Sequence, residues 1–168
     1  TGYCTEDFDL WPQFCRCILV LVMLFGGCAG STAGGVKVSR IVLLCKSLRR
    51  DLRRVMHSHE VRPITLDGHR VTEETVSSVS VFFFTYISIL LLGTLILSLD
   101  NIDFTAAFTA SLTAISNVGP GLGAVGPTCN FGFLSGISKL TMSAIMLLGR
   151  LEIMPLLVLL MPSVWRRK

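Results

Sequence analysis

The chain has 168 residues, of which 51% are hydrophobic and only 15% are charged. Its mean hydropathy of +0.67 is higher than soluble domains usually show, and its long uncharged runs indicate membrane spans. This composition therefore argues against a soluble domain. Because the chain begins with Thr1, we expect an upstream part of the protein to precede it.

The net charge of +4 is unevenly distributed along the chain. Most basic residues lie in one segment between apolar runs, at residues 46–76, or in the last three residues. The opposite ends of these runs carry acidic residues, namely Glu6, Asp7, Asp9, Asp100 and Asp103. Short basic loops stay cytoplasmic, which places residues 46–76 and the C-terminus in the cytoplasm. A basic segment can also bind nucleic acid, but its position between spans predicts the lipid bilayer as partner and no nucleic acid.

Residues 12–48 are expected to form one span that is broken in its middle. Pro12 to Gly26 is apolar but too short to cross alone, and Val36 to Leu48 is again helical by pattern. Five glycines fall within residues 26–35, and each costs about 1 kcal/mol in a helix. Such breaks at membrane depth mark ion sites or gates. The alternative is a glycine-rich helix packed tightly against its neighbours.

Residues 49–76 form a charged connector. Pro63 and Asp67-Gly68 predict turns there, and the residues on either side of Asp67-Gly68 are compatible with a small hairpin. Val79 to Leu99 is then a continuous apolar run, about 30 Å long as a helix, which matches one hydrocarbon thickness.

A short helix is expected over residues 104–116, capped by Asn101 or Asp103. It is about 20 Å long and reaches only the middle of the membrane. The glycine-containing segment Asn117 to Gly121 follows it. Bare carbonyls at that depth occur only where they line a wet cavity, and rings of them replace the water shell of potassium. We therefore predict a filter strand that faces the negative end of the helix dipole.

The last helix is expected over residues 134–164, with Arg150 near its middle. A charge there costs about 2.5–3.5 kcal/mol on insertion scales, so a functional role is the default. Glu152 points to another face, and the carbonyls and hydroxyls of the 26–35 loop are the expected acceptors. The alternative is an ion pair with a carboxylate upstream of this chain.

The chain also carries a faint internal repeat. Thr1-Gly2-Tyr3 precedes an inward span that contains Met23-Leu24-Phe25-Gly26, just as Asn117-Val118-Gly119 precedes one that contains Met146-Leu147-Leu148-Gly149. Because the two repeated units run in the same direction, such units can be arranged around an axis along the membrane normal and surround a pore. The fold expected from this pattern is an all-α integral membrane protein of repeated helix–pore loop–helix units, like a potassium channel.

Three segments, in this order, resemble the TrkH/KtrB potassium uptake proteins, which are related to the HKT transporters. They are Gly26–Lys37, Asn117–Gly123 and Leu147–Glu152. By this resemblance the chain begins inside the third filter: residues 1–48 end the third pore repeat, 49–76 are a cytoplasmic connector, and 77–168 form the fourth repeat.

The resemblance implies potassium transport through a selectivity filter and an intramembrane gate. The filter residues it implies are Thr1, Gly2, Tyr3, Asn117, Val118, Gly119, Pro120 and Gly121. The gate residues it implies are Gly26, Gly27, Gly30, Ser31, Thr32, Gly34, Gly35 and Arg150. Ala33 departs from the glycine expected there. The family further implies a homodimer in the cell (inner) membrane with a cytoplasmic nucleotide-binding regulatory subunit of the TrkA/KtrA type, potassium as substrate and no cofactor.

Two other classes remain open, a broken-helix carrier of another solute and a non-conducting membrane subunit. The carrier predicts acidic or aromatic side chains at the breaks, whereas glycine, serine and threonine occur there. An enzyme is not expected. The segment Gly121 to Gly126 fits G-x-G-x-x-G literally but follows a half-membrane helix rather than a strand.

Overall fold

The computed structural model describes residues 2–28, 34–56, 64–66 and 68–150. Most of these residues are helical, and the only sheet among them is a two-stranded hairpin. The elements are α1 (Gln13–Leu24), α2 (Val38–Met56), β1 (Thr65–Leu66), β2 (His69–Arg70), α3 (Glu73–Leu97), α4 (Phe104–Ser116) and α5 (Gly136–Arg150), with short 3-10 turns η1 (Phe8–Leu10), η2 (Ser98–Asp100), η3 (Gly123–Val125) and η4 (Phe131–Phe133).

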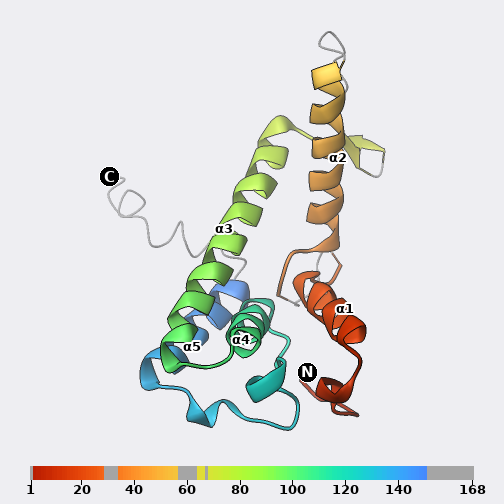
Figure 1. Ribbon diagram of the computed structural model, residues 1–168. Helices are drawn as coiled ribbons and strands as arrows, with labels where there is room; N and C mark the ends of the chain where they lie inside the picture. The colour runs from red at the N-terminus through yellow and green to blue at the C-terminus, as the bar shows by residue number, and fades with distance from the viewer. Residues whose placement is uncertain (1, 29–33, 57–63, 67, 151–168) are drawn as a thin grey trace, which may run out of the picture.

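The short helix α4 lies at the centre of the fold. It contacts α1, α3 and α5, which surround it at one end of the molecule (Figure 1). Nearly every residue from Ala106 to Ser116 is buried. Its sequence is rich in alanine, serine and threonine, and small side chains let neighbouring helices approach closely. The hydrophobic core forms around it, with Leu112 and Ile115 fully buried beside Leu97 of α3.

The bounds of α4 are those expected from the sequence, and both ends have clear causes. The Asp103 carboxylate accepts a hydrogen bond from the Thr105 amide at 3.0 Å and caps the N-terminus. Hydrogen bonding from the Thr105 hydroxyl, and then from the Thr105 amide, lowers the pKa of Asp103, because it favours the charged form. At the other end Asn117 adopts the left-handed conformation, with φ 55°, and ends the helix.

The predicted break in the first span is confirmed by the described residues. Helix α1 ends at Leu24 and α2 begins at Val38. The chain on the two sides of the break is tied together, since the Gly26 amide donates to the Val36 carbonyl at 2.9 Å and the Val36 amide donates to the Leu24 carbonyl at 3.3 Å. Phe25 and Val36 thus form an isolated parallel bridge.

The long helix α3 begins at Glu73, earlier than the apolar run that starts at Val79. The reason is the polar first turn, where the Thr72 hydroxyl accepts from the Thr75 amide and two glutamates face the positive helix end. In the described part of the chain, α3 with its following turn, Glu73–Asp100, is the one helix long and apolar enough to cross a bilayer, with a hydropathy of 2.3.

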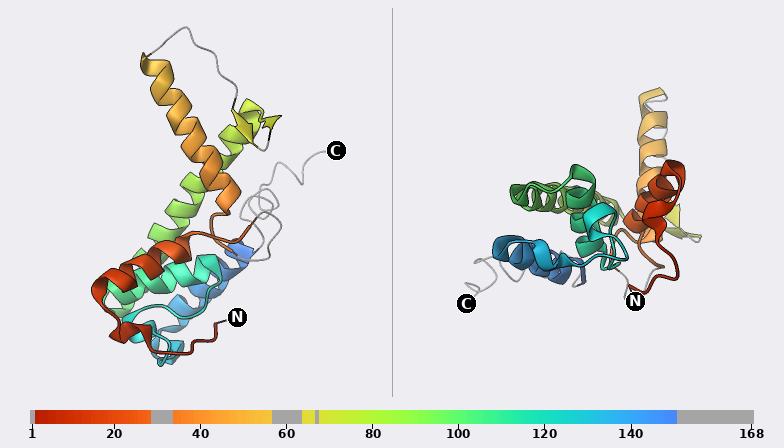
Figure 2. Two further views of the ribbon diagram at one scale, coloured as in Figure 1. Left: turned by 90° about the vertical axis from the view of Figure 1, so that its right-hand side faces the viewer. Right: turned by 60° about the horizontal axis from the view of Figure 1, so that its bottom comes forward.

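The predicted hairpin is present where β1 pairs antiparallel with β2. The Lys46 side chain donates to the Thr65 carbonyl at 2.7 Å, which joins the hairpin to α2. Leu43, Ile64, Val76 and Val79 form a small second core below it. The left view of Figure 2 shows the hairpin at the start of α3.

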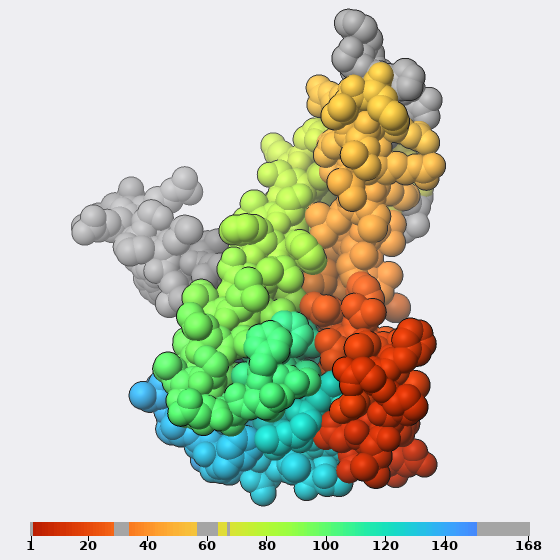
Figure 3. Space-filling view, in the orientation of Figure 1, coloured from red at the N-terminus to blue at the C-terminus, as the bar shows by residue number. Residues whose placement is uncertain are grey.

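In space-filling view, α2 and α3 run together away from the body formed by α1, α4 and α5 (Figure 3). Arg40 of α2 lies over the ring of Phe82 of α3, with 4.0 Å between the guanidinium carbon and the ring centroid. Helix α5 starts at Gly136, close to the predicted start at residue 134, and the structure describes it to Arg150. The predicted remainder, residues 151–164, lies outside the described residues.

Candidate ion-conducting site

The predicted filter strand, Asn117 to Gly121, directly follows the C-terminal end of α4 and belongs to no helix or sheet. The Val118 amide donates to the Thr113 carbonyl of α4 at 3.1 Å, and just beyond the strand the Leu122 amide donates to the Thr109 hydroxyl of α4 at 3.0 Å. In the described part of the chain, no hydrogen bond ends on the carbonyl oxygens of Val118, Gly119 or Pro120. The strand is therefore held to α4 through a backbone amide, and its carbonyl oxygens are available to bind a ligand.

The two predicted filter segments meet, although more than a hundred residues separate them. A methyl group added at Gly119 would lie 3.0 Å from the Cα atom of Gly2, and one added at Gly2 would lie 3.8 Å from the Val118 carbonyl oxygen. Gly119 has φ 120° and Gly2 has φ 75°, which L side chains rarely adopt. Of the predicted filter residues, Gly2, Tyr3 and Asn117–Gly121 are thus placed near one another, and Thr1 lies outside the described residues.

The backbone of two other segments packs closely against the C-terminal end of α4. A methyl group added at Gly34 would lie 2.7 Å from the Ser116 carbonyl oxygen, and one added at Gly149 of α5 would overlap the Ile115 carbonyl oxygen. The Asn117 side-chain amide donates to the Met146 carbonyl at 3.3 Å. The start of the strand is therefore held between the glycine-rich loop and α5.

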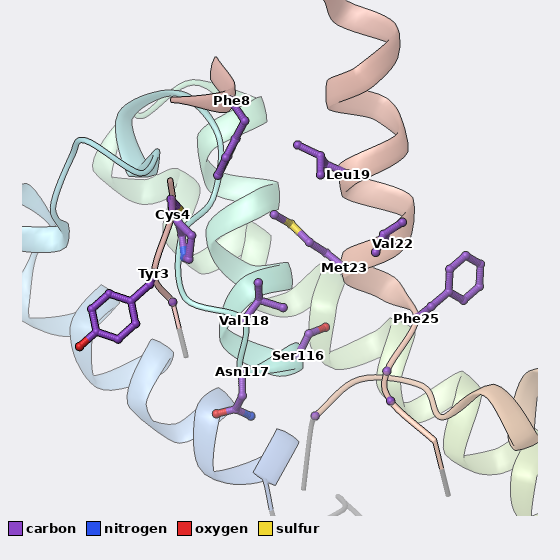
Figure 4. A pocket seen from close by; sticks show the side chains of 15 residues that line it. Tyr3, Cys4, Phe8, Leu19, Val22, Met23, Phe25, Ser116, Asn117 and Val118 are labelled. Carbon is purple, nitrogen blue, oxygen red and sulfur yellow. The ribbon is translucent and has the colours of Figure 1, made fainter. Parts of the chain in front are cut away.

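A cavity of about 470 Å³ lies between the filter segments and the broken helix. In Figure 4, Leu19 and Met23 point from α1 towards the strand at Val118, whereas Phe25 points away from it. Glycines of both kinds of predicted site border this cavity, namely Gly2 from the filter and Gly26, Gly27 and Gly34 from the gate loop. The cavity therefore adjoins both predicted sites.

The structure locates part of the predicted gate. Gly35 has φ 83° and follows Gly34 directly below the strand. Arg150 is the last residue of α5 and is exposed. Gly30, Ser31 and Thr32 lie outside the described residues, as does Ala33. The predicted contact between Arg150 and the loop therefore stays a prediction.

The segment Gly121 to Gly126 forms a tight turn rather than a strand-to-helix junction. The Gly121 amide donates to the Val125 carbonyl at 2.7 Å and the Gly126 amide to the Gly123 carbonyl at 2.9 Å. A dinucleotide fingerprint requires a strand, a turn and a helix, so this geometry does not support one. In the described residues, no group of three His, Cys, Asp or Glu side chains is placed to hold a metal ion.

Sequence reasoning missed the side chains that support the filter from outside it. The Thr109 hydroxyl holds the outer part of the strand, the Tyr86 hydroxyl lies 2.9 Å from the Ser116 hydroxyl below it, and the Asp9 carboxylate accepts the Gly123 amide beyond it. No sequence spacing joins Asp9 to Gly123, which are 114 residues apart. The one sequence signal that could have indicated such a supporting side chain was the presence of a hydroxyl group within an apolar helix, as at Tyr86.

Comparisons with known proteins agree on one family. A family model described as TrkH, cation transport protein, matches residues 1–167. The chain is 38% identical over 165 residues to the Trk system potassium uptake protein TrkH of Salmonella typhimurium, covering 98% of this chain and 34% of that protein. It is 39% identical over 171 residues to the Trk system potassium uptake protein TrkI of Halomonas elongata, covering 99% of this chain and 34% of that protein.

The fold is similar to a crystal structure of the potassium transporter TrkH from Vibrio parahaemolyticus. The TM-score is 0.87 at 39% sequence identity, over 98% of this chain and 35% of that one. The chain thus spans about a third of the length of these relatives. All these relatives are transport proteins by name, and the structural match agrees with the predicted all-α membrane fold.

Proposed function

The chain belongs to the family of TrkH cation transport proteins, and from this premise we propose that it supplies part of a potassium-conducting pore. The observation that carries the proposal is the meeting of Gly2 and Gly119 at the end of the half-length helix α4. Carbonyl oxygens of two repeats then lie beside one cavity, and several such strands around an axis are how filters coordinate potassium.

The surroundings of the strand suit a cation. The C-terminal end of α4 points at it, and that end carries a partial negative charge. The carbonyl oxygens of Val118, Gly119 and Pro120 accept no hydrogen bond within the described residues. These residues are half-buried, and carbonyl oxygens at membrane depth that lack donors cost free energy unless a cation or water binds to them. A dehydrated alkali cation is therefore the ligand we propose for the filter residues.

The gate proposal rests on the position of the glycine-rich loop. Gly34 contacts Ser116 directly below the strand, and Gly26 and Gly27 border the same cavity. An ion that leaves the filter towards the cytoplasm must pass this loop. Arg150, at the end of the helix that packs against α4, supplies a fixed positive charge near this path and opposes cation flow.

The membership of this family also suggests the membrane, the orientation and the partners of the protein. We propose that it lies in the cell (inner) membrane, with residues 46–76 and the C-terminus in the cytoplasm, and that two copies form a dimer. A nucleotide-binding subunit of the TrkA/KtrA type is the proposed regulator on the cytoplasmic side. The C-terminal part of α2, which carries Arg49, Arg50, Arg53 and Arg54, and the hairpin lie at the end of the molecule away from α4 (Figure 1), and this is the end that we assign to the cytoplasm.

The test is a flux measurement on the protein in its natural, full-length form, reconstituted into vesicles. We expect uptake of rubidium, as a stand-in for potassium, in excess of sodium uptake. Empty vesicles and vesicles with the Gly119→Ser variant are the controls. Uptake of an organic solute without rubidium flux would favour a carrier, and the absence of any flux would favour a non-conducting subunit; either result contradicts the proposal.

A further inference from the structure

The carboxylate of Asp9 joins the segment after one predicted filter strand to the turn after the other. Both carboxylate oxygens of Asp9 lie 3.0 Å from the amide nitrogen of Gly123. Asp9 lies in η1, downstream of Gly2 and Tyr3, and Gly123 opens η3, downstream of Gly119. These two turns lie side by side at the end of the molecule away from the hairpin (Figure 1).

The bond continues a row of supports along the fourth filter strand. The Leu122 amide is held by Thr109 of the same repeat, and the next amide, that of Gly123, is held by Asp9 of the other repeat. Hydrogen bonds to an ionised carboxylate are about twice as strong as those between neutral groups. The outer end of the strand is thereby fixed against both repeats.

The surroundings of Asp9 are built to hold its carboxylate in place. The Asp7 side chain accepts the Asp9 amide at 3.0 Å and orders the backbone of η1. On the other side Gly126 leaves just enough room, since a methyl group added there would overlap the Asp9 Oδ2 atom. Gly126 has φ −66°, which every residue can adopt, so its lack of a side chain serves to leave room for the Asp9 carboxylate and, secondarily, for the Gly123 carbonyl oxygen, which would lie 3.0 Å from an added methyl group.

We propose that Asp9 is a positioning residue for ion selectivity, which fixes the third filter segment in register with the fourth. This inference rests on the proposed function, because it assumes that the two segments share one ion path. Carbonyl oxygens from two strands coordinate the same cation well only if the strands keep a fixed spacing. Among the described residues, the Asp9 carboxylate makes the hydrogen bond between the segments that follow the two filters. Without it their spacing is no longer fixed at this end, and the sites would also accept smaller cations.

The test compares rubidium with sodium uptake by the full-length protein in vesicles. Asp9→Ala is expected to lower the rubidium-to-sodium ratio about three- to tenfold, the effect of losing one charge-assisted hydrogen bond. Asp9→Asn keeps one oxygen that can accept the Gly123 amide and should restore part of the ratio. Glu6→Ala removes the same charge from an exposed position in the same segment and should leave the ratio within about twofold of the natural protein.

Gly126→Ala is a second variant that disturbs the Asp9–Gly123 contact, and it does so without changing any charge. The test therefore remains possible even if Asp9→Ala does not fold. The added methyl group displaces the carboxylate and should lower the ratio as Asp9→Ala does. In the double variant the methyl group meets no carboxylate, so the ratio should be no lower than in Asp9→Ala alone.

Three outcomes would overturn the inference: an unchanged ratio in Asp9→Ala, an equal loss in Glu6→Ala, or independent losses that multiply in the double variant. An unselective or inactive natural protein would instead count against the proposed function. The failure of the inference and the failure of the function are thus distinguishable.

Discussion

The hydroxyl groups of Tyr86 and Ser116 lie 2.9 Å apart and share a hydrogen bond inside the helix bundle. Tyr86 belongs to the spanning helix α3 and is only 1% exposed, and Ser116 is the last residue of α4 before the strand. The bond therefore ties the start of the predicted filter to the longest helix of the chain.

Replacement of Tyr86 by Phe removes this bond and leaves a buried hydroxyl on Ser116. We expect the free energy of unfolding to fall by about 0.5–1.5 kcal/mol. The measurement is thermal unfolding in detergent. Ser116→Ala should cost a similar amount, and the double variant should cost less than the sum of the two, because both changes remove one interaction. Strictly additive losses would show that the hydroxyls do not act as a pair.

A side chain at Gly149 is expected to separate α5 from α4. The methyl group of Gly149→Ala would overlap the Ile115 carbonyl oxygen and lie 2.9 Å from the Asn117 side-chain nitrogen. Overpacking of this kind costs about 1–3 kcal/mol. Unfolding temperature and the yield of folded protein from membranes are the measurements. Gly136→Ala is the matched control on the same helix, since no atom lies within 4 Å of the added methyl group; equal effects of the two variants would contradict the close packing described here.

Gly119→Ser is expected to lower the potassium-to-sodium ratio. Its φ of 120° strains any L side chain, and the nearest atom to an added Cβ is the Cα of Gly2 at 3.0 Å. The strand must shift, and carbonyls that shift no longer fit the same ion. Competition of sodium with rubidium uptake measures the effect, with Gly136→Ser as control. A ratio equal to that of the natural protein would count against Gly119 as a filter residue.

Arg150→Ala is expected to raise the cation flux or weaken its regulation, because it removes a positive charge near the proposed path. Initial rates of rubidium uptake across a range of concentrations are the measurement. Lys139→Ala provides the comparison, since Lys139 lies on the same helix but donates to the Gly132 carbonyl at 2.8 Å, towards the other end. Rates identical to those of the natural protein at every concentration would remove Arg150 from the gate.

The features that the sequence predicted well are those set by local chemistry. The glycines between Gly26 and Gly35 predicted the break between α1 and α2, and the short apolar run before Asn117 predicted α4. The start of α3 was predicted too late, because hydropathy does not register a polar first turn capped by Thr72. The positions of the helix break and of α4 therefore followed from local composition, whereas the start of α3 depended on a capping hydrogen bond.

The supports of the candidate site could not be predicted, because they join residues that no local pattern relates. Thr109, Tyr86 and Asp9 reach backbone or hydroxyl groups 13, 30 and 114 residues away. Such contacts depend on how the two repeats pack, which periodicity does not encode. The glycines at the close approaches, Gly34 and Gly149, were recognised only as part of motifs, and their reason is the room they leave for the end of α4.

The parallel bridge between Phe25 and Val36 has a mechanical consequence. Because the chain leaves the first half-helix and enters the second at adjoining points, the Leu24 end of α1 and the Val38 end of α2 are held together by backbone hydrogen bonds. The two half-helices are therefore mechanically coupled at this point, and a displacement of one is transmitted to the other through the backbone rather than through side-chain packing alone.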